Sequence, residues 1–157
     1  IVITRIEQID DASSVKEEIQ RLVGPTPVFT SRLMTSGIRT IAGQRVHKES
    51  VPQPVAAFCG VGNPGSFFNH LRGEGCAPAF TRTFPDHHNY TQSELDQLVN
   101  DAKAHGARSL ITTAKDAIKL TRCKFNLSCY VLDIQISIDD EDRLVELIHQ
   151  VCRRAED

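Results

Sequence analysis

The chain has 157 residues, a length typical of one domain of ordinary size. Hydrophobic residues make up 40% and charged residues 24%, as in soluble globular proteins, and the net charge of −2 provides no basic field to attract nucleic acid. No run of about 18 apolar residues is present, so we expect no membrane-spanning segment. The five cysteines include no Cys-x-x-Cys pair, which argues against a structural zinc site and favours free thiols in a reducing compartment.

The beginning of the chain predicts a small α/β segment. Residues 1–5 read as a strand that starts abruptly without Met, so we expect this chain to be part of a longer protein. Ser14-x-x-Glu17 has the pattern of a capping box for a helix that Gly24-Pro25 ends. Residues 27–31 and 37–42 are expected to form two further strands.

The polar stretch from residue 44 to Pro54 predicts a linker, after which strands and helices alternate regularly. The expected strands are 55–59, 77–84, 109–112 and 130–138; the expected helices follow caps at Asn63, Thr91 and Thr113, with a last helix at 139–154. This alternation predicts an α/β fold, a Rossmann-like and mostly parallel sheet with helices on both faces, preceded by the small α/β segment and linker strands. Ligands of such sheets bind at the carboxyl ends of the strands.

A glycine pattern follows the first of these regular strands. Gly60-Val61-Gly62-Asn63-Pro64-Gly65 matches the G-x-G-x-x-G motif of dinucleotide-binding folds, and Asp86 lies about twenty residues further on. Pro64 has no N–H to offer a pyrophosphate, which counts against that use. Two interpretations stay open: an NAD(P)-binding turn, and a turn that needs glycine for its backbone geometry.

The segment from Phe84 to Tyr90, Phe-Pro-Asp-His-His-Asn-Tyr, carries the densest chemistry of the chain. Asp86, His87 and His88 place one carboxylate beside two imidazoles, which titrate near neutral pH. They could coordinate Zn, Mn or Fe, as in a metal-dependent phosphoesterase, or perform acid–base catalysis. The Asp-x-Asp motif of such phosphoesterases is absent upstream. A solvated polar loop is the third alternative.

Thr112-Thr113-Ala114-Lys115-Asp116 combines hydroxyls, a cation and a helix start at a strand end. Such a segment could bind a phosphate, and simple capping by Thr113 and Asp116 is the alternative. The chain has no Gly-Lys dipeptide and therefore no G-x-x-x-x-G-K-[ST] phosphate loop.

Together these segments resemble the C-terminal part of the tetraacyldisaccharide 4′-kinase family, the lipid A 4′-kinases. The matching pieces stand in the family's order over nearly the whole chain: the strand at Val2–Arg5, Phe58–Pro64 with Phe67, Phe68 and Leu71, Phe84–Tyr90, and Thr112–Leu120. The family carries the glycine pattern with its proline, so the resemblance implies no NAD site. The family usually has Glu where this chain has Ala114.

The resemblance implies an ATP- and Mg²⁺-dependent kinase that phosphorylates the 4′-hydroxyl of a tetraacylated disaccharide 1-phosphate at the cytoplasmic face of the bacterial inner membrane. It places the phosphate loop and a catalytic carboxylate in an N-terminal half that this chain lacks. We therefore expect the chain alone to be inactive. Its expected partners are its own N-terminal domain, the lipid substrate and, through the parent protein, the membrane surface. No nucleic acid and no metal site within this chain are expected.

The resemblance also assigns roles to residues. Asp86 and either His87 or His88 would assist the missing carboxylate in activating the sugar hydroxyl. The residues expected near the substrate or a phosphate are Asn63, Asn89, Tyr90, Thr112, Thr113, Lys115 and Asp116. With the polar linker as boundary, residues 1–50 would be the tail of the N-terminal kinase domain plus linker strands, and residues 51–157 the C-terminal Rossmann-like domain.

Overall fold

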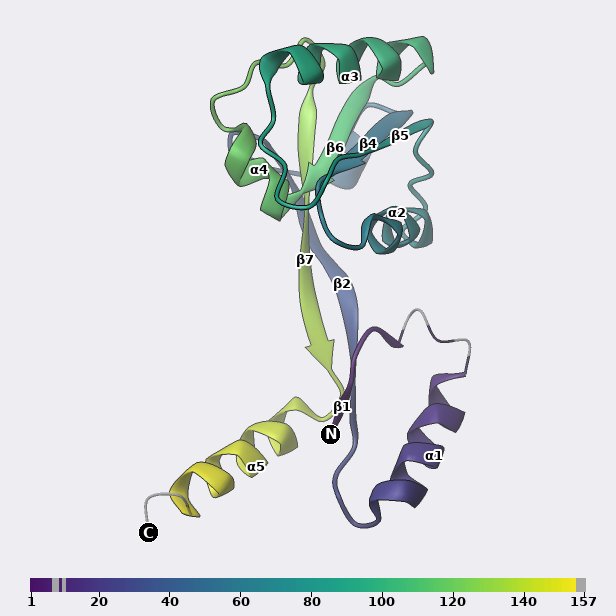
Figure 1. Cartoon of the computed structure of the whole chain (residues 1–157), viewed down its shortest axis with the longest axis vertical. Coiled ribbons are helices and arrows are strands. Elements are labelled where there is room, and N and C mark those ends of the chain that lie inside the picture. The colour runs from purple at the N-terminus through teal and green to yellow at the C-terminus, as the bar shows by residue number, and fades with distance from the viewer. Residues whose placement is uncertain (7–8, 10, 155–157) are drawn as a thin grey trace. The chain divides into compact units, whose positions relative to one another are not determined.

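The computed structural model describes residues 1–6, 9 and 11–154. In chain order its elements are β1 (Val2–Ile3), α1 (Ala12–Val23), β2 (Phe29–Thr40), β3 (Arg45–Val46), a 3₁₀ helix (Lys48–Ser50), β4 (Val55–Cys59), α2 (Pro64–Gly73), β5 (Phe80–Thr83), α3 (Gln92–Ala104), β6 (Ser109–Thr113), α4 (Ala114–Leu120), β7 (Cys129–Ile138) and α5 (Glu141–Arg154) (Figure 1). They divide into two compact units, one of residues 1–34 with 135–157 and one of residues 35–134.

The unit of residues 35–134 is built on a parallel sheet. β4 pairs with β5 on one side and with β6 on the other, β6 pairs with β7, and all three pairings are parallel. The chain therefore moves from β4 to one neighbour and then crosses to the other, so the strand order reverses at β4. In α/β sheets such a reversal opens a place for a ligand beside the carboxyl ends of the strands.

Alternation along β4 directs side chains to two separate cores. Ala56 and Phe58 pack with Leu95 and Leu98 of α3 and Leu120 of α4. On the other face, Val55, Ala57 and Cys59 pack with Phe68 and Leu71 of α2. All five residues of β4 are fully buried, which is typical of a central parallel strand. The predicted α/β fold, with a mostly parallel sheet and helices on both of its faces, is confirmed.

The other unit holds β1, α1 and α5, together with residues 29–34 of β2 and 135–138 of β7. β1 pairs in parallel with β2, and Val2 lies opposite Phe29. Asp139 accepts hydrogen bonds from the Lys16 ammonium at 2.9 Å and from the Thr30 backbone N–H, which connects α1 and β2 to the end of β7. α1 and α5 contain no fully buried residue among those described.

Three local predictions differ from the structure. Asp11, and not Ser14, caps α1, because its carboxylate accepts the Ser14 N–H at 3.0 Å. The two strands expected at 27–31 and 37–42 are one continuous strand, β2, since Gly37 continues the extended backbone between them. β5 is shorter than expected and begins at Phe80, after Pro78, which has no N–H to donate to a ladder.

The expected domain boundary after residue 50 falls within the second compact unit, whose own limits are 34/35 and 134/135. β2 and β7 each have residues in both units, so the chain passes between the units within strands and not at the polar stretch 44–54. That polar stretch forms β3, the 3₁₀ helix and a turn with a cis peptide bond before Pro54. The assignment of residues 1–50 to a kinase-domain tail with linker strands stays a prediction.

Candidate functional site

Two loops and the start of α4 meet at the carboxyl ends of β4, β5 and β6. The loop after β4 begins at Gly60, the loop after β5 carries residues 84–90, and β6 leads directly into α4 at Thr113. Phe84 N–H donates to the Cys59 carbonyl oxygen at 2.8 Å, so the second loop starts beside the first. The three motifs singled out in the sequence therefore lie together at one edge of the sheet.

Asp116 lies at the centre of this edge and is fully buried. Its Oδ1 accepts the Tyr90 hydroxyl at 2.9 Å, and its Oδ2 accepts the Gly60 N–H at 3.1 Å and the Thr113 hydroxyl at 2.7 Å. Burial and the Asp116 charge raise the pKa of Tyr90 strongly, which keeps its hydroxyl protonated as a donor. The same two effects raise the pKa of the Cys59 thiol to about 11.

The glycine pattern serves this close packing. A Cβ on Gly60 would lie 3.0 Å from the Pro85 carbonyl oxygen, 3.0 Å from the Tyr90 hydroxyl and 3.2 Å from an Asp116 oxygen. Asn63 caps α2 by accepting the Ser66 N–H at 3.1 Å, and Pro64 occupies the first turn. Loop packing and helix capping thus account for the pattern without a dinucleotide, as the alternative interpretation held.

Asp86 is exposed at the rim of this edge and forms an ion pair with Lys115, whose ammonium lies 3.1 Å from Oδ1. Its Oδ2 lies 3.7 Å from Nε2 of His87. The Lys115 hydrogen bond lowers the pKa of Asp86, with His87 contributing in the same direction. Asp86 is therefore a carboxylate at neutral pH, placed between a cation and an imidazole.

The two histidines have different surroundings. The His87 side chain is 75% exposed, and its φ of 60° is in the left-handed region that non-glycine residues rarely adopt. Its backbone N–H donates to Asp86 Oδ1 at 3.0 Å, which stabilises this turn. Backbone strain of this kind is concentrated at functional sites. His87 is thus held out toward solvent with a carboxylate beside its ring.

His88 is only 20% exposed and turns inward. Its ring stacks on Phe84 with centroids 4.9 Å apart and meets Tyr90 edge-on at 5.1 Å. Its Nε2 lies 3.1 Å from Glu94 Oε1, and the Lys119 ammonium donates to its carbonyl oxygen at 3.0 Å. These contacts give His88 a packing role and leave His87 as the accessible imidazole.

The remaining predicted residues have different surroundings. Asn63 and Thr113 are helix caps, and Tyr90 and Asp116 are joined to each other. Thr112 is fully buried in β6, and its hydroxyl has no hydrogen-bond partner among the described residues. Asn89 is exposed beside His88. Apart from the helix cap Asn63, the predicted residues with exposed side chains at this edge are Asp86, His87, Asn89 and Lys115, of which Asp86 and Lys115 form an ion pair with each other.

Two residues of the site were missed by sequence reasoning. Glu94 completes a capping box with the predicted cap Thr91, and its second carboxylate oxygen reaches His88. Lys119 follows Lys115 by four residues, a spacing that places both on one face of α4. That spacing was the available signal for its contact with the loop.

Metal binding finds no support at this edge. Among the described residues, no group of three or more His, Cys, Asp or Glu side chains is arranged to hold a metal ion. His88 is directed to Glu94, away from the exposed Asp86–His87 pair, so the three side chains do not converge.

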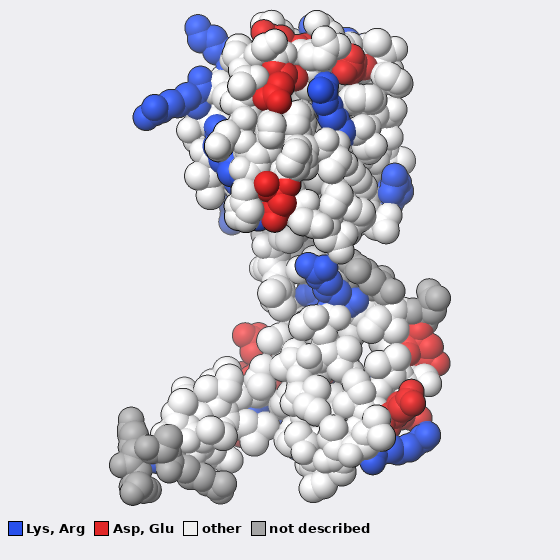
Figure 2. Space-filling model, in the orientation of Figure 1, with Lys and Arg blue, Asp and Glu red and all other residues white. Residues whose placement is uncertain are grey.

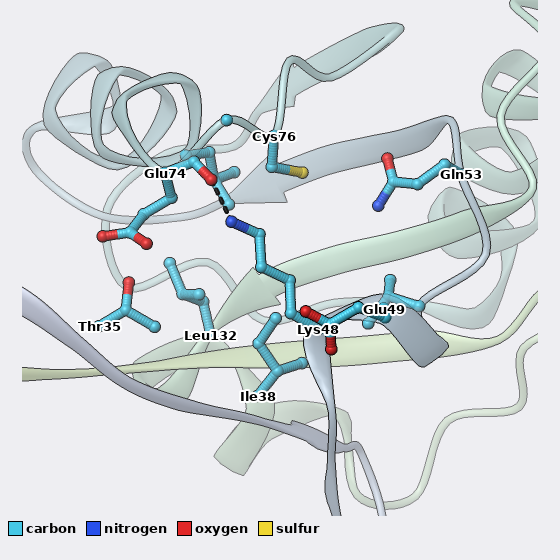
Figure 3. Close-up of a pocket in the computed structure, with 11 residues that line it drawn as sticks. Thr35, Ile38, Lys48, Glu49, Gln53, Glu74, Cys76 and Leu132 are labelled. Carbon is cyan, nitrogen blue, oxygen red and sulfur yellow. Dashed lines mark hydrogen bonds between the residues drawn. The ribbon is translucent and has the colours of Figure 1, made fainter.

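A separate pocket of about 310 Å³ lies in the same compact unit, beside the 3₁₀ helix. Figure 3 shows Lys48 extending across it toward the main-chain carbonyl of Glu74, to which it donates a hydrogen bond. Burial raises the pKa of the Cys76 thiol, so this thiol stays protonated at neutral pH. None of the predicted site residues lines the pocket, and the reactive groups remain at the sheet edge.

A family model described as tetraacyldisaccharide-1-P 4′-kinase matches residues 1–153. The chain belongs to this family. Among curated proteins, the tetraacyldisaccharide 4′-kinase of Rickettsia felis is 45% identical over 92 residues, which are 59% of this chain and 27% of that protein. The Rickettsia canadensis enzyme is 41% identical over 92 residues, 59% of this chain and 28% of that protein. The 92 matched residues thus cover little more than a quarter of the length of these tetraacyldisaccharide 4′-kinases.

A solved structure supports the tetraacyldisaccharide 4′-kinase fold. It is described as the "apo" form of LpxK from Aquifex aeolicus in complex with ATP. The two align with a TM-score of 0.54 and 21% identity over 96% of this chain and 51% of that chain. In the described part of this chain, no helix has the length and apolar character needed to cross a bilayer.

Proposed function

We propose that this chain is the C-terminal part of a kinase that transfers the γ-phosphate of ATP to the 4′-hydroxyl of tetraacyldisaccharide 1-phosphate, a step of lipid A biosynthesis. The observation that carries the proposal is the family match over residues 1–153. The meeting of the three matching motifs at one sheet edge supports it, because a shared site requires residues from separate loops to lie together.

Within that reaction we assign the catalytic role of an imidazole to His87. Phosphoryl transfer depends chiefly on positioning and charge, and the attacking hydroxyl must lose a proton. His87 is exposed, and the Asp86 carboxylate beside it is fixed by Lys115 and can orient the ring. In the proposal, Asp86 and His87 assist a carboxylate of the N-terminal half as it activates the sugar hydroxyl. His88 maintains the loop.

ATP and Mg²⁺ are proposed to bind mainly to the N-terminal half. The groups at this edge do not fit a triphosphate: the Lys115 cation is paired with Asp86, Asp116 is a buried acceptor, and Pro64 lacks an N–H to donate. The relative from Aquifex aeolicus is described in complex with ATP, which supports ATP as the donor. It follows that the chain by itself should not transfer phosphate.

The N-terminal domain is the proposed partner of the unit of residues 1–34 and 135–157. Several apolar side chains of this unit are exposed: Leu22 at 80%, Val151 at 67%, Ile136 at 66% and Ile148 at 51%. Exposed apolar residues at successive turns of α5 are typical of a surface that another domain covers. The parent protein would act on its lipid substrate at the cytoplasmic face of the inner membrane.

On the face shown in Figure 2, Lys and Arg side chains are dispersed among Asp, Glu and uncharged surface. The proposed function involves no nucleic acid, because the net charge of −2 provides no overall basic field to attract a polyanion.

The deciding experiment is a transfer assay with γ-labelled ATP and tetraacyldisaccharide 1-phosphate. It compares a kinase of full family length that contains this chain with the 157-residue chain alone. The proposal predicts labelled lipid from the longer protein and none from the chain alone. An inactive longer protein whose ATP binding is intact would contradict the proposed substrate, and turnover by the chain alone would contradict the placement of the donor site.

A further inference from the structure

Every element of the sheet edge is connected to one carboxylate. Asp116 belongs to the first turn of α4, yet it binds the end of β4 through the Gly60 N–H and the loop after β5 through the Tyr90 hydroxyl. Tyr90 also packs edge-on against Phe58 of β4, with ring centroids 5.9 Å apart. The segment of residues 84–90, which carries Asp86 and His87, is therefore held at its last residue, Tyr90, by the buried Asp116 carboxylate.

This arrangement is costly unless it is complete. A carboxylate removed from water loses the favourable free energy of its hydration unless hydrogen bonds replace those to water. Asp116 has three such bonds from uncharged donors: one from Thr113, the cap of α4, and two from outside the helix and its cap, Gly60 and Tyr90. Loss of either outside donor would leave a buried oxygen poorly satisfied, so the two loops are ordered together.

We propose that Asp116 and Tyr90 are a positioning pair that fixes the Asp86–His87 turn against the end of β4; the catalytic consequence rests on the proposed function of His87. Neither residue is assigned a contact with the substrate, because Asp116 is buried and the Tyr90 hydroxyl is directed to Asp116. This revises the expected role of both residues, from groups near the substrate to groups that place others.

Two further contacts from α4 act on the same turn. Lys115 holds the Asp86 side chain and Lys119 holds the His88 carbonyl. Together with Asp116 they give α4 three attachments to one loop of seven residues, at its acidic residue, its second histidine and its tyrosine. Asp116 differs from the two lysines because its carboxylate is fully buried, so water does not readily replace a hydrogen bond that a substitution removes.

The test is hydrogen exchange of the 157-residue chain at the backbone N–H groups of Gly60, His87 and His88, in the wild type and in Tyr90→Phe. The substitution removes only the hydroxyl. The expected result is exchange about tenfold faster or more at these three positions, with core amides of β4 and β6 unchanged. Tyr130→Phe is the matched control, because it removes the chain's other tyrosine hydroxyl far from this loop in sequence, and it should leave all three unchanged.

Unchanged exchange at the three amides in Tyr90→Phe would overturn the proposal, as would a uniform increase that includes the core of β4. In a kinase of full family length, Tyr90→Phe should lower kcat about tenfold with little change in KM, since His87 is displaced and not removed. If wild-type kinase activity is absent, the exchange result still decides whether the pair positions the turn, whereas the proposed function fails.

Discussion

His88 Nε2 lies 3.1 Å from Glu94 Oε1, so the second histidine of the Asp-His-His segment is attached to the first turn of α3. Glu94 accepts the Thr91 N–H and hydroxyl with its other oxygen, at 2.9 and 2.8 Å. One carboxylate therefore caps the helix and orients the histidine that precedes it. The neighbouring His87 has no share in this arrangement.

Substitutions of the two histidines should differ in their effect on the stability of the chain. We expect His88→Ala to lower the free energy of unfolding of the chain by about 1–3 kcal/mol, because it removes the stacking on Phe84 and the bond to Glu94. His87→Asn should change it by no more than about 0.5 kcal/mol, since the side chain is exposed and Asn tolerates a left-handed φ. Urea denaturation of both variants measures the difference. Equal losses of unfolding free energy in the two variants would contradict the packing role assigned to His88 alone.

In catalysis the order should be reversed: substitution of His87 should lower the rate more than substitution of His88. In a kinase of full family length, His87→Asn is expected to lower kcat by about 10²-fold, the usual scale for proton-transfer assistance. A variant at His88 should lose activity only in proportion to the folded protein it loses. Initial rates normalised to the folded fraction make the comparison. A normal rate for His87→Asn would return the segment to the solvated-loop interpretation.

Glu94 should make the stability of the chain depend on pH. Hydrogen bonds from the Thr91 backbone and hydroxyl lower its pKa from 4.5 to about 2, with a smaller contribution from His88. A lowered folded-state pKa means that the carboxylate stabilises the fold fully above its ordinary pKa and loses this effect as the pH falls toward about 2.

Glu94→Gln tests this dependence, because glutamine keeps the shape and loses the charge. The urea midpoint of the variant should lie below that of the wild type at about pH 6, and the gap should narrow at about pH 3, where Glu94 is already largely protonated in the unfolded chain. Glu74→Gln, at an exposed position outside the site, is the control and should show no such narrowing. A gap that stays constant with pH would refute the assigned coupling.

Local signals in the sequence were sufficient for much of the fold. Asn63, Thr91 and Thr113 each cap the helix predicted for them, and the apolar positions of α3 are its buried residues. These features depend on residues a few positions apart. The continuity of β2 was not predictable in the same way, because it depends on pairing with β1 and β7, which are distant in sequence, more than on the residues between its two halves.

The candidate site was predictable in its members but not in their roles. Asp86, His87, Tyr90 and Asp116 were all singled out, yet nothing in the chain order shows that Tyr90 binds Asp116, 26 residues away. The same applies to the two histidines: adjacent in sequence, they are separated by a positive φ at His87 that directs one ring to solvent and the other to Glu94. Only tertiary contacts distinguish them.

The glycine pattern provides a last test, by two substitutions that look alike in the sequence. At Gly60 an added methyl group would meet the Pro85 carbonyl and the Tyr90 hydroxyl, both at 3.0 Å. The Tyr90 hydroxyl cannot move without disturbing its bond to Asp116, and the Pro85 carbonyl accepts the His88 N–H at 3.1 Å. At Gly62 the nearest atom would be an oxygen of the exposed Asp86 side chain at 3.5 Å, an ordinary contact. Neither glycine has a positive φ, so the difference between them is steric.

We therefore expect Gly60→Ala to lower the free energy of unfolding by about 1–3 kcal/mol, and Gly62→Ala to change it by no more than about 0.5 kcal/mol. Thermal or urea denaturation of the two variants side by side makes the comparison. If the pattern instead served a bound pyrophosphate, both alanines would leave the free chain stable and would weaken nucleotide binding. Equal tolerance of the two substitutions would show that close loop packing is not what requires glycine at position 60.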